Sequence, residues 1–349
     1  MTQAFAFAHG PDWRACVEAL GRPGRGLGFV YFTDVLAGEA DKILDSLKTQ
    51  TGVRDWIGSV GTGILATGTE YQDGPALAAM VADFDAFSVF SGRAPLKANG
   101  SFAVVHADPG APDLPGLVSD MSAKVDTGYI VGGVSSSRSR TVQIANEVLS
   151  GGLSGAVLGE EVAVATRLTQ GCTPLPRRGS PGTAGRFRVT EGEDNIIVRL
   201  DGRPALEVLL EAVGGERTQL LVGLPVPGSD TGDYTARNIV GVDPKTGLIA
   251  IGDLVEPGME VLFCKRDAAA AKKDLEGILS SLKRDAPHPR GALYYSCVAR
   301  GEHMFGSRGA ELDLVKRSLG EVPLVGFFCN GEISRDRLYG YTGVLTVFR

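Results

Sequence analysis

Two short polar segments each follow an apolar run, and they carry the side chains best suited to chemistry. The first, Ser296-Cys-Val-Ala-Arg-Gly-Glu-His303, comes directly after the apolar residues 292–295. The guanidinium of Arg300 can hold a ligand carboxylate, while Glu302 or His303 can hold an amino group or transfer a proton. A thiol packed as a small hydrophobic group, with solvated charges after it, explains the same residues equally well.

The second segment, Phe327-Phe-Cys-Asn-Gly-Glu-Ile333, also follows an apolar run. Its Asn330-Gly331 pair suits a turn with positive φ, and Glu332 is either a ligand carboxylate or a solvated turn residue. Cys329 can act as a nucleophile only with a lowered pKa and a neighbouring base. A buried structural thiol is therefore the simpler interpretation.

Two further stretches offer hydroxyls, amides and a thiol. The stretch Gly132-Gly-Val-Ser-Ser-Ser-Arg138 can bind a carboxylate or phosphate, although it is not G-x-G-x-x-G, a P-loop or G-x-S-x-G. Cys172 lies in Thr169-Gln-Gly-Cys-Thr-Pro174, which is either part of a site or a structural turn. The five cysteines form no C-x-x-C pair and have no His at metal-ligand spacing. We expect reduced thiols and neither a metal nor a cofactor.

The elements that must position these groups alternate between two periodicities. Apolar residues at helical spacing predict amphipathic helices over 13–20, 40–47, 77–84, 114–121, 205–212 and 275–282. Runs rich in β-branched and aromatic residues predict strands over 27–33, 86–90, 102–106, 129–134, 162–169, 219–224, 259–264, 292–297, 324–328 and 343–348. Hairpin signals such as Asp243-Pro-Lys-Thr-Gly247 indicate antiparallel pairing. The fold class expected is α+β, with mixed, largely antiparallel sheets flanked by helices.

The order of these elements indicates two related lobes. The loop 131–137 aligns with 325–331, and each follows a predicted strand in its half of the chain. The Asp201-Gly-Arg-Pro204 turn leads into a new helix, so we place two domains at 1–204 and 205–349. If the lobes face each other, the aligned loops approach one cleft, which is the usual place for a small ligand.

Charge and composition exclude several classes of protein. The net charge of −6 gives no electrostatic reason to expect nucleic-acid binding. The chain has neither a secretory leader pattern nor the roughly 18 consecutive apolar residues of a membrane span, so we expect a cytoplasmic protein. The 48 glycines show no three-residue period and suit many tight turns. The oligomeric state is left open.

Taken together, the motifs resemble the FIST family, the F-box and intracellular signal transduction domain. The stretches similar to the FIST N part are Val131-Gly-Gly-Val-Ser-Ser136, Leu168-Thr-Gln-Gly-Cys-Thr-Pro174, Val189-Thr190 and Leu200-Asp-Gly-Arg-Pro-Ala-Leu206. Those similar to the FIST C part are Arg237-Asn-Ile-Val-Gly-Val-Asp243, Tyr295-Ser-Cys-Val-Ala-Arg-Gly301, Val325-Gly-Phe-Phe-Cys-Asn-Gly-Glu-Ile333 and Tyr341-Thr-Gly-Val-Leu345. The resemblance implies a sensory module that binds small ligands such as amino acids and is coupled to signalling partners. It supplies no agreed catalytic residues.

The leading hypothesis is a small-ligand-binding sensory protein that signals through a partner, because no stretch of this chain is left for an output domain. The expected ligand is an amino acid or another small carboxylate, and the expected pocket is lined by Ser135, Ser136, Cys172, Cys297, Arg300, Asn330 and Glu332. On this hypothesis, Arg300→Ala weakens carboxylate binding and leaves the melting temperature nearly unchanged. Two alternatives stay open: a cysteine-dependent enzyme using Cys297 or Cys329 with His303, and a protein-interaction scaffold.

Overall fold

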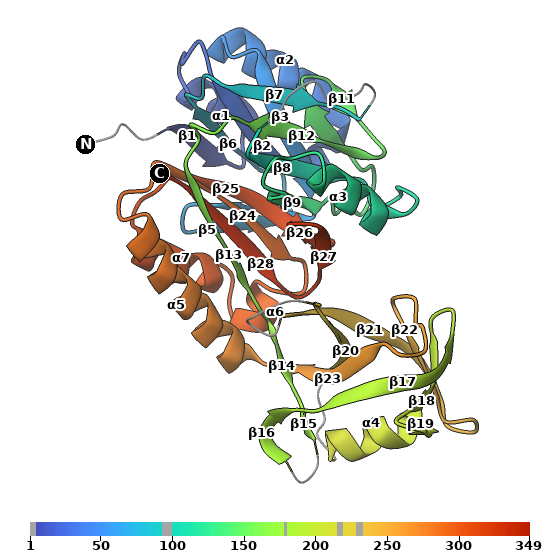
Figure 1. Cartoon of the computed structure of the whole chain (residues 1–349). Coiled ribbons are helices and arrows are strands. Elements are labelled where there is room, and N and C mark those ends of the chain that lie inside the picture. Colours follow the sequence, from blue (N-terminus) through green and yellow to red (C-terminus); the bar gives the residue numbers. More distant parts are fainter. Residues whose placement is uncertain (1–4, 93–99, 178–179, 215–218, 228–232) are drawn as a thin grey trace. The chain divides into compact units, whose positions relative to one another are not determined.

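The fold is α+β, as predicted, with mixed and mostly antiparallel sheets flanked by helices (Figure 1). The structure is a computed structural model that describes residues 5–92, 100–177, 180–214, 219–227 and 233–349. The chain forms two compact units, of which the first is 1–170 with 272–349 and the second is 171–271. The division predicted after residue 204 lies inside the second unit, so the compact units divide the chain differently from the two sequence halves.

Three six-stranded sheets, counted over the described residues, form the first unit. One has the order β1-β6-β2-β3-β10-β11, another β7-β12-β8-β9-β26-β27, and the third β13-β28-β24-β25-β4-β5. The bounds in the first are β1 Ala6–Gly10, β6 Leu77–Ala82, β2 Leu27–Thr33, β3 Asp55–Gly61, β10 Gln143–Ala145 and β11 Val148–Leu149. Those in the second are β7 Phe87–Phe90, β12 Leu153–Leu158, β8 Phe102–Ala107, β9 Ile130–Val134, β26 Glu332–Ser334 and β27 Arg337–Tyr339. Those in the third are β13 Val164–Thr169, β28 Gly343–Phe348, β24 Gly291–Cys297, β25 Leu324–Cys329, β4 Gly63–Ala66 and β5 Thr69–Gln72.

Each of these sheets has one parallel pair at its centre and antiparallel neighbours on both sides. The parallel pairs are β2 with β3, β8 with β9, and β24 with β25. A helix connects the two strands of each pair, as parallel pairing requires. The connecting helices are α2 (Ala40–Thr51), α3 (Leu114–Ser122) and, for the third pair, α6 (Glu302–Phe305) followed by α7 (Ala310–Leu319).

The hairpin that follows each parallel pair in the chain does not join the sheet of that pair. It pairs with a strand of another sheet instead. Hairpin β4–β5 pairs with β25, hairpin β10–β11 with β3, and hairpin β26–β27 with β9. The chain then returns through β6, β12 or β28 beside the first strand of its own pair. The first unit is therefore a ring of three structural repeats. The loops aligned in the sequence follow β9 and β25, which are equivalent strands, and the third copy follows β3.

The register confirms that the repeats are equivalent residue by residue. Gly58, Gly132 and Gly326 occupy the same place, opposite Val30, Val105 and Tyr294 across their parallel pairs. A Cβ atom at these glycines would lie 1.8, 1.7 and 1.7 Å from the carbonyl oxygen of that opposite residue. Each repeat thus requires glycine where its two central strands approach most closely.

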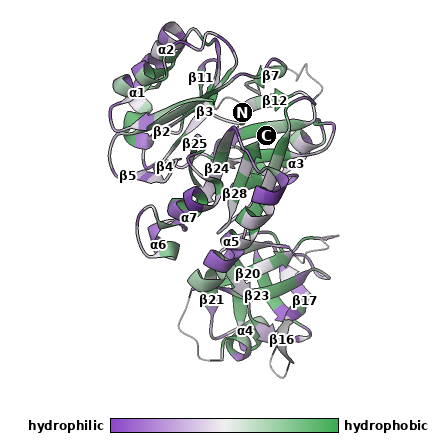
Figure 2. Cartoon of the chain, turned by 90° about the vertical axis from the view of Figure 1, so that its left-hand side faces the viewer, coloured by the Kyte–Doolittle hydropathy of each residue, from purple (hydrophilic) through white to green (hydrophobic). Residues whose placement is uncertain are grey.

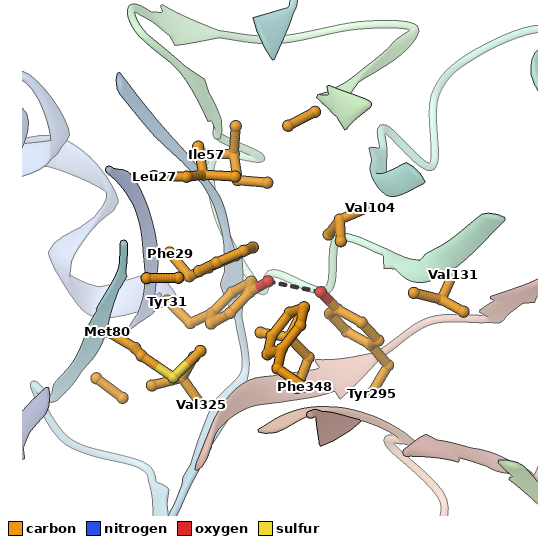
Figure 3. Close-up of a cluster of buried hydrophobic side chains, with 14 of the residues drawn as sticks. Leu27, Phe29, Tyr31, Ile57, Met80, Val104, Val131, Tyr295, Val325 and Phe348 are labelled. Carbon is orange, nitrogen blue, oxygen red and sulfur yellow. Dashed lines mark hydrogen bonds between the residues drawn. The ribbon is translucent and has the colours of Figure 1, made fainter. Parts of the chain in front are cut away.

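One face of each sheet contributes to a shared apolar core. Figure 3 shows Phe29, Val104, Val131 and Val325, which come from the central strands of the three repeats. The opposite faces pack against helices: α1 (Trp13–Ala19) with α2, α3, and α5 (Ala268–Asp285) with α7. In Figure 2 the strands β24 and β28 are mostly hydrophobic, whereas α5 and α7 carry much hydrophilic surface.

Five of the predicted helices form, but the one predicted over 77–84 is wrong. Leu77–Ala82 is strand β6, which pairs with β1 on one side and β2 on the other and is fully buried. A strand buried on both faces carries a continuous apolar run, and such a run also satisfies helical spacing.

The second unit is a closed antiparallel barrel inserted in the chain between β13 and β24. Its six strands follow the order β23-β17-β18-β22-β21-β20, and β20 pairs back with β23. Their bounds are β17 Arg186–Glu193, β18 Ile196–Leu200, β20 Leu220–Pro225, β21 Tyr234–Asp243, β22 Leu248–Ile251 and β23 Glu260–Arg266. Helix α4 (Ala205–Val213) packs its apolar face on the barrel core. Strands β14 (Cys172–Pro174) and β19 (Arg203–Pro204) extend the barrel, and β15 (Pro176–Arg177) pairs with β16 (Ser180–Ala184).

Within the described ranges, we find no helix with both the length and the apolar character needed to cross a bilayer.

Candidate functional site

The ends of β9 and β25 lie side by side in the first unit. The backbone amide of Asn330 donates to the Val134 carbonyl at 3.0 Å, and the Val134 amide donates to the Gly331 carbonyl at 2.9 Å. The Ser136 hydroxyl donates to the Phe328 carbonyl. The two loops aligned in the sequence therefore meet, and they bring Ser135 and Ser136 close to the segment 329–332.

Cys297 joins this group from the neighbouring strand. It is the register partner of Cys329 across the parallel pair β24–β25, and both thiols are buried. Burial raises the pKa of Cys297 to about 12, and it also raises that of Cys329 well above its ordinary value. The Glu332 carboxyl, when charged, raises both values further. Both side chains are thus neutral thiols at physiological pH.

Glu332 is the buried carboxyl of the group. Its Oε2 accepts hydrogen bonds from the Thr342 hydroxyl at 2.8 Å and the Thr342 amide at 3.2 Å. No oriented hydrogen bond from a described residue reaches Oε1. Burial raises the pKa of Glu332 to about 8, against the lowering effect of Thr342, the Arg300 charge and the Cys297 thiol. The carboxyl is therefore mainly protonated at neutral pH.

Arg300 is the buried cation beside Glu332. Its Nε and Nη2 donate to Glu311 Oε1 at 2.8 and 2.6 Å, and only 1% of the residue is exposed. Its remaining nitrogen, Nη1, has no hydrogen-bond partner among the residues that the structure describes. The Arg300 guanidinium therefore keeps one donor available to a ligand although its charge is already paired.

Glu311, on α7, accepts hydrogen bonds from several neighbouring residues. Besides Arg300, it accepts from the Tyr294 hydroxyl at 2.6 Å, the Ser296 hydroxyl at 3.1 Å and the Gly301 amide at 3.3 Å. Removing Arg300 would leave the Glu311 charge buried and uncompensated. The expectation that Arg300→Ala preserves the melting temperature assumed a guanidinium not needed by the fold, and the buried pair leads us to expect a lower melting temperature instead.

Two residues named in the sequence analysis differ from the others in their surroundings. Cys172 is in β14 of the second unit, where it is buried and faces Arg266 across the β14–β23 pair. His303 is on α6 and is exposed, whereas the thiols it would activate are buried. A nucleophilic cysteine requires a lowered pKa, so the pKa values of Cys297 and Cys329 do not support the enzyme alternative.

The sequence reasoning missed the contribution of the first repeat. The Ser59 hydroxyl lies 2.6 Å from that of Ser135, and the Thr62 amide donates to the Ser136 hydroxyl at 2.9 Å. Ser59 is in β3 and Thr62 directly follows it, so the third strand end completes the site. The available signal was Gly58, which corresponds to Gly132 in β9 and Gly326 in β25.

A hydrogen-bonded trio lies on the shared face of the three sheets. Tyr31, His106 and Tyr295 occupy the same place in the three repeats. Each is the next residue along the strand after the one that faces the shared glycine. The Tyr31 hydroxyl lies 3.0 Å from His106 Nε2. It also lies 2.7 Å from the Tyr295 hydroxyl (Figure 3). Burial lowers the pKa of His106 to about 3 and raises those of both tyrosines. All three rings are therefore uncharged at neutral pH.

The inward-facing residues of the repeats change from apolar to polar along the strands. Phe29, Val104 and Leu293 lie two residues before the trio, at the level below it. Ser135, Ser136, Cys297 and Cys329 follow the level of the trio, toward the carboxyl ends. A search over the described residues finds no group of three or more His, Cys, Asp or Glu side chains placed to hold a metal ion.

Comparisons with known proteins agree with the resemblance seen in the sequence. Residues 26–203 match the family model described as the FIST N domain, and residues 205–335 match the FIST C domain. FIST domains are associated with signal transduction and small-ligand sensing.

Mycobacterial proteins are similar over most of their length. The uncharacterized protein Rv0628c of Mycobacterium tuberculosis (strain ATCC 25618 / H37Rv) is 32% identical, over 89% of this chain and 88% of the relative. The uncharacterized protein Mb0898c of Mycobacterium bovis is 30% identical, over 97% of this chain and 96% of the relative.

Proposed function

The chain belongs to the FIST family, and from that premise we propose that it is a cytoplasmic small-ligand-binding sensory protein. Its ligand is an amino acid or another small carboxylate, and its signal passes through a partner protein. The binding residues are Ser135, Ser136, Cys297, Arg300, Asn330 and Glu332, joined by Ser59 and Thr62 from the first repeat. Cys172 lies in the second unit and is not assigned to this group.

The observation that carries the proposal is a pair of buried polar atoms without partners. Arg300 Nη1 is a hydrogen-bond donor and Glu332 Oε1 is a hydrogen-bonding oxygen, and within the described part of the chain neither is satisfied. The two side chains lie close enough for the Arg300 charge to lower the pKa of Glu332. Unsatisfied buried groups are rare in folded proteins and call for a ligand or an ordered water.

The chemistry of the pair suits a ligand with a carboxylate. Arg300 Nη1 can donate to a carboxylate oxygen, and protonated Glu332 can donate to the other. For an amino acid, the ammonium group would instead favour the charged form of Glu332 and displace its proton. Net charge-assisted hydrogen bonds contribute roughly 1.5 to 3 kcal/mol each.

A thermal-shift screen tests the proposal with amino acids, small carboxylates and nucleotides as probes. A ligand at 100 times its dissociation constant raises the free energy of unfolding by about 2.7 kcal/mol. We expect carboxylate-bearing probes to raise the melting temperature and nucleotides to leave it unchanged. A screen without any shift would count against a ligand sensor and favour the interaction-scaffold alternative.

The matched variant removes the guanidinium without leaving Glu311 charged. In Arg300→Met with Glu311→Gln, the amide oxygen at 311 can still accept from Tyr294, which now donates to Glu311. We expect this double variant to fold and to bind a carboxylate probe at least about tenfold more weakly. An unchanged affinity would remove Arg300 from the site.

A further inference from the structure

We propose that the ligand site extends inward to the trio Tyr31, His106 and Tyr295, where His106 Nδ1 hydrogen-bonds an uncharged polar group of the ligand. This inference rests on the proposed function and deepens it. It names the ligand class as a small carboxylate that also carries a hydroxyl or amide group.

The first observation is that only one of the two ring nitrogens of the fully buried His106 has a hydrogen-bond partner among the described residues. Its Nε2 is engaged by the Tyr31 hydroxyl, whereas Nδ1 has no hydrogen-bond partner in any of the described segments. The exposed fraction of His106 is 0%. Leaving a buried polar nitrogen unpaired is unfavourable. A hydrogen-bonding group of a ligand would pair it.

The second observation is a line of hydroxyl groups from the protein surface toward the trio. Thr62 is half-buried and is bonded to Ser136, and next to them Ser135 is bonded to Ser59. Ser59 is the register partner of Tyr31. These hydroxyls connect the surface end of the binding residues with the level of the trio.

The third observation is that, apart from Tyr295, the polar groups at this level belong to the first and second repeats. Ser154 and Gln143 lie beside His106 and Ser59 across strand pairs, and the Ser154 hydroxyl donates to Gln143 Oε1 at 2.6 Å. At the place that Ser59 occupies, the other repeats have Gly133 and Phe327. Polar side chains of the first and second repeats thus lie beside His106 and Ser59 at this level.

The hydrogen-bonding capacity and neutral charge of the trio determine which group of a ligand it can bind. A neutral imidazole with one nitrogen bonded to Tyr31 offers one hydrogen bond and no charge. The Tyr295–Tyr31–His106 chain can run in either direction, so Nδ1 either donates or accepts. An uncharged hydroxyl or amide suits both directions, whereas a charged group at this depth would lack a counter-charge.

The experiment compares pairs of amino acids with similar shapes and different polarity. The probes are threonine with valine, serine with alanine, and asparagine with leucine, and the measurement is the dissociation constant by calorimetry. For at least one pair we expect the polar member to bind about tenfold more tightly. His106→Phe should reduce that preference to about twofold or less, and His106→Gln, which keeps one donor and one acceptor, should restore part of it.

Thr346→Val is the matched control, because Thr346 is also fully buried and shares a 2.9 Å hydrogen bond with Thr166 at a different level of the same sheets. We expect it to keep the preference of the wild type. Should His106→Phe not fold, Tyr31→Phe breaks the trio at the bond to His106 and is expected to reduce the preference too.

The outcomes separate this inference from the proposed function. If no carboxylate probe binds the wild-type protein, the proposed function fails and this inference fails with it. If the wild type binds carboxylates without preferring the polar member, or if His106→Phe keeps the preference, only this inference is overturned. A crystal structure of the liganded protein with only an ordered water at His106 Nδ1 would overturn it as well.

Discussion

Glu311 holds Arg300 by two hydrogen bonds to a single oxygen and leaves the third guanidinium nitrogen unpaired in the described chain. The other oxygen of Glu311 accepts from Ser296 and the Gly301 backbone. A helix residue thereby fixes the strand end and the loop that carry the binding residues. The pair thus has a structural role besides the recognition role that we propose for Arg300, and the two can be separated by mutation.

Breaking this pair should destabilise the protein strongly. Glu311→Ala leaves the Arg300 charge buried without a partner, and we expect a loss of about 3 to 5 kcal/mol in the free energy of unfolding, measured by urea denaturation. Arg300→Met with Glu311→Gln should lose much less, because no buried charge remains. The control is Arg203→Ala, which removes exposed pairs with Glu207 and Glu211 and should change the free energy of unfolding little. Equal losses at both sites would contradict a buried, structural pair.

The three equivalent glycines should be equally intolerant of a side chain. Gly58→Ala, Gly132→Ala and Gly326→Ala each place a Cβ within 2 Å of a carbonyl oxygen of the neighbouring strand, so each should destabilise by about 3 kcal/mol or more. The matched control is Gly277→Ala in α5, where a Cβ meets nothing within 4 Å. That change should be neutral or stabilising by up to about 1 kcal/mol. One tolerated substitution among the three would contradict the residue-level equivalence of the repeats.

The sequence predicts the helices and strands of the repeats better than it predicts how many repeats there are. The loops after β9 and β25 share a glycine followed by polar residues, and their alignment agrees with the structure. The equivalent segment at the end of β3, Gly58-Ser-Val-Gly61, shares only Gly58 with both of them, because apolar positions in a buried sheet accept any residue of suitable size. The exchanged hairpins are also invisible in one sequence, since each pairs with a strand far along the chain.

The candidate site was predicted in part for a similar reason. Polar residues after apolar strands identified Cys297, Arg300, Asn330 and Glu332, which lie at two adjoining strand ends. Glu311 lies in an amphipathic helix where a glutamate is normally solvated, and its burial depends on contacts that the sequence pattern does not encode. His106 has no signal of its own in the sequence, because the residues beside it, Tyr31 and Tyr295, are 75 and 189 positions away.

The cysteines should be unreactive in the folded protein. All five are buried, and burial raises the pKa of Cys16 to about 11 and that of Cys297 to about 12. At about pH 7.5 we expect iodoacetamide to label the native protein far more slowly than the urea-unfolded protein, because the thiolate is the reactive form. Mass spectrometry of tryptic peptides gives the site. Rapid native labelling at Cys297 or Cys329 would revive the enzyme alternative.

The stability of the protein should depend on pH through Glu332. The pKa of Glu332 is about 8 in the folded protein and near the ordinary value of 4.5 in the unfolded chain. Between these values the folded state binds more protons, so the free energy of unfolding falls as pH rises from about 4.5 to about 8 and levels off above it. The slope from this one group is at most about 1.4 kcal/mol per pH unit.

Comparison with Glu332→Gln isolates this contribution. The amide resembles the protonated acid and can still accept from Thr342, but it does not ionise. We expect the wild type to lose stability relative to Glu332→Gln as pH rises through that window, measured by urea denaturation at each pH. His106 acts in the opposite direction at lower pH, since its folded pKa of about 3 lies below its ordinary 6.5, and Glu70, with a pKa of about 7, acts as Glu332 does. Both are present in the two proteins and cancel in the difference.

Parallel stability curves would show that Glu332 is charged and solvated, and would remove it as the neutral donor of the site.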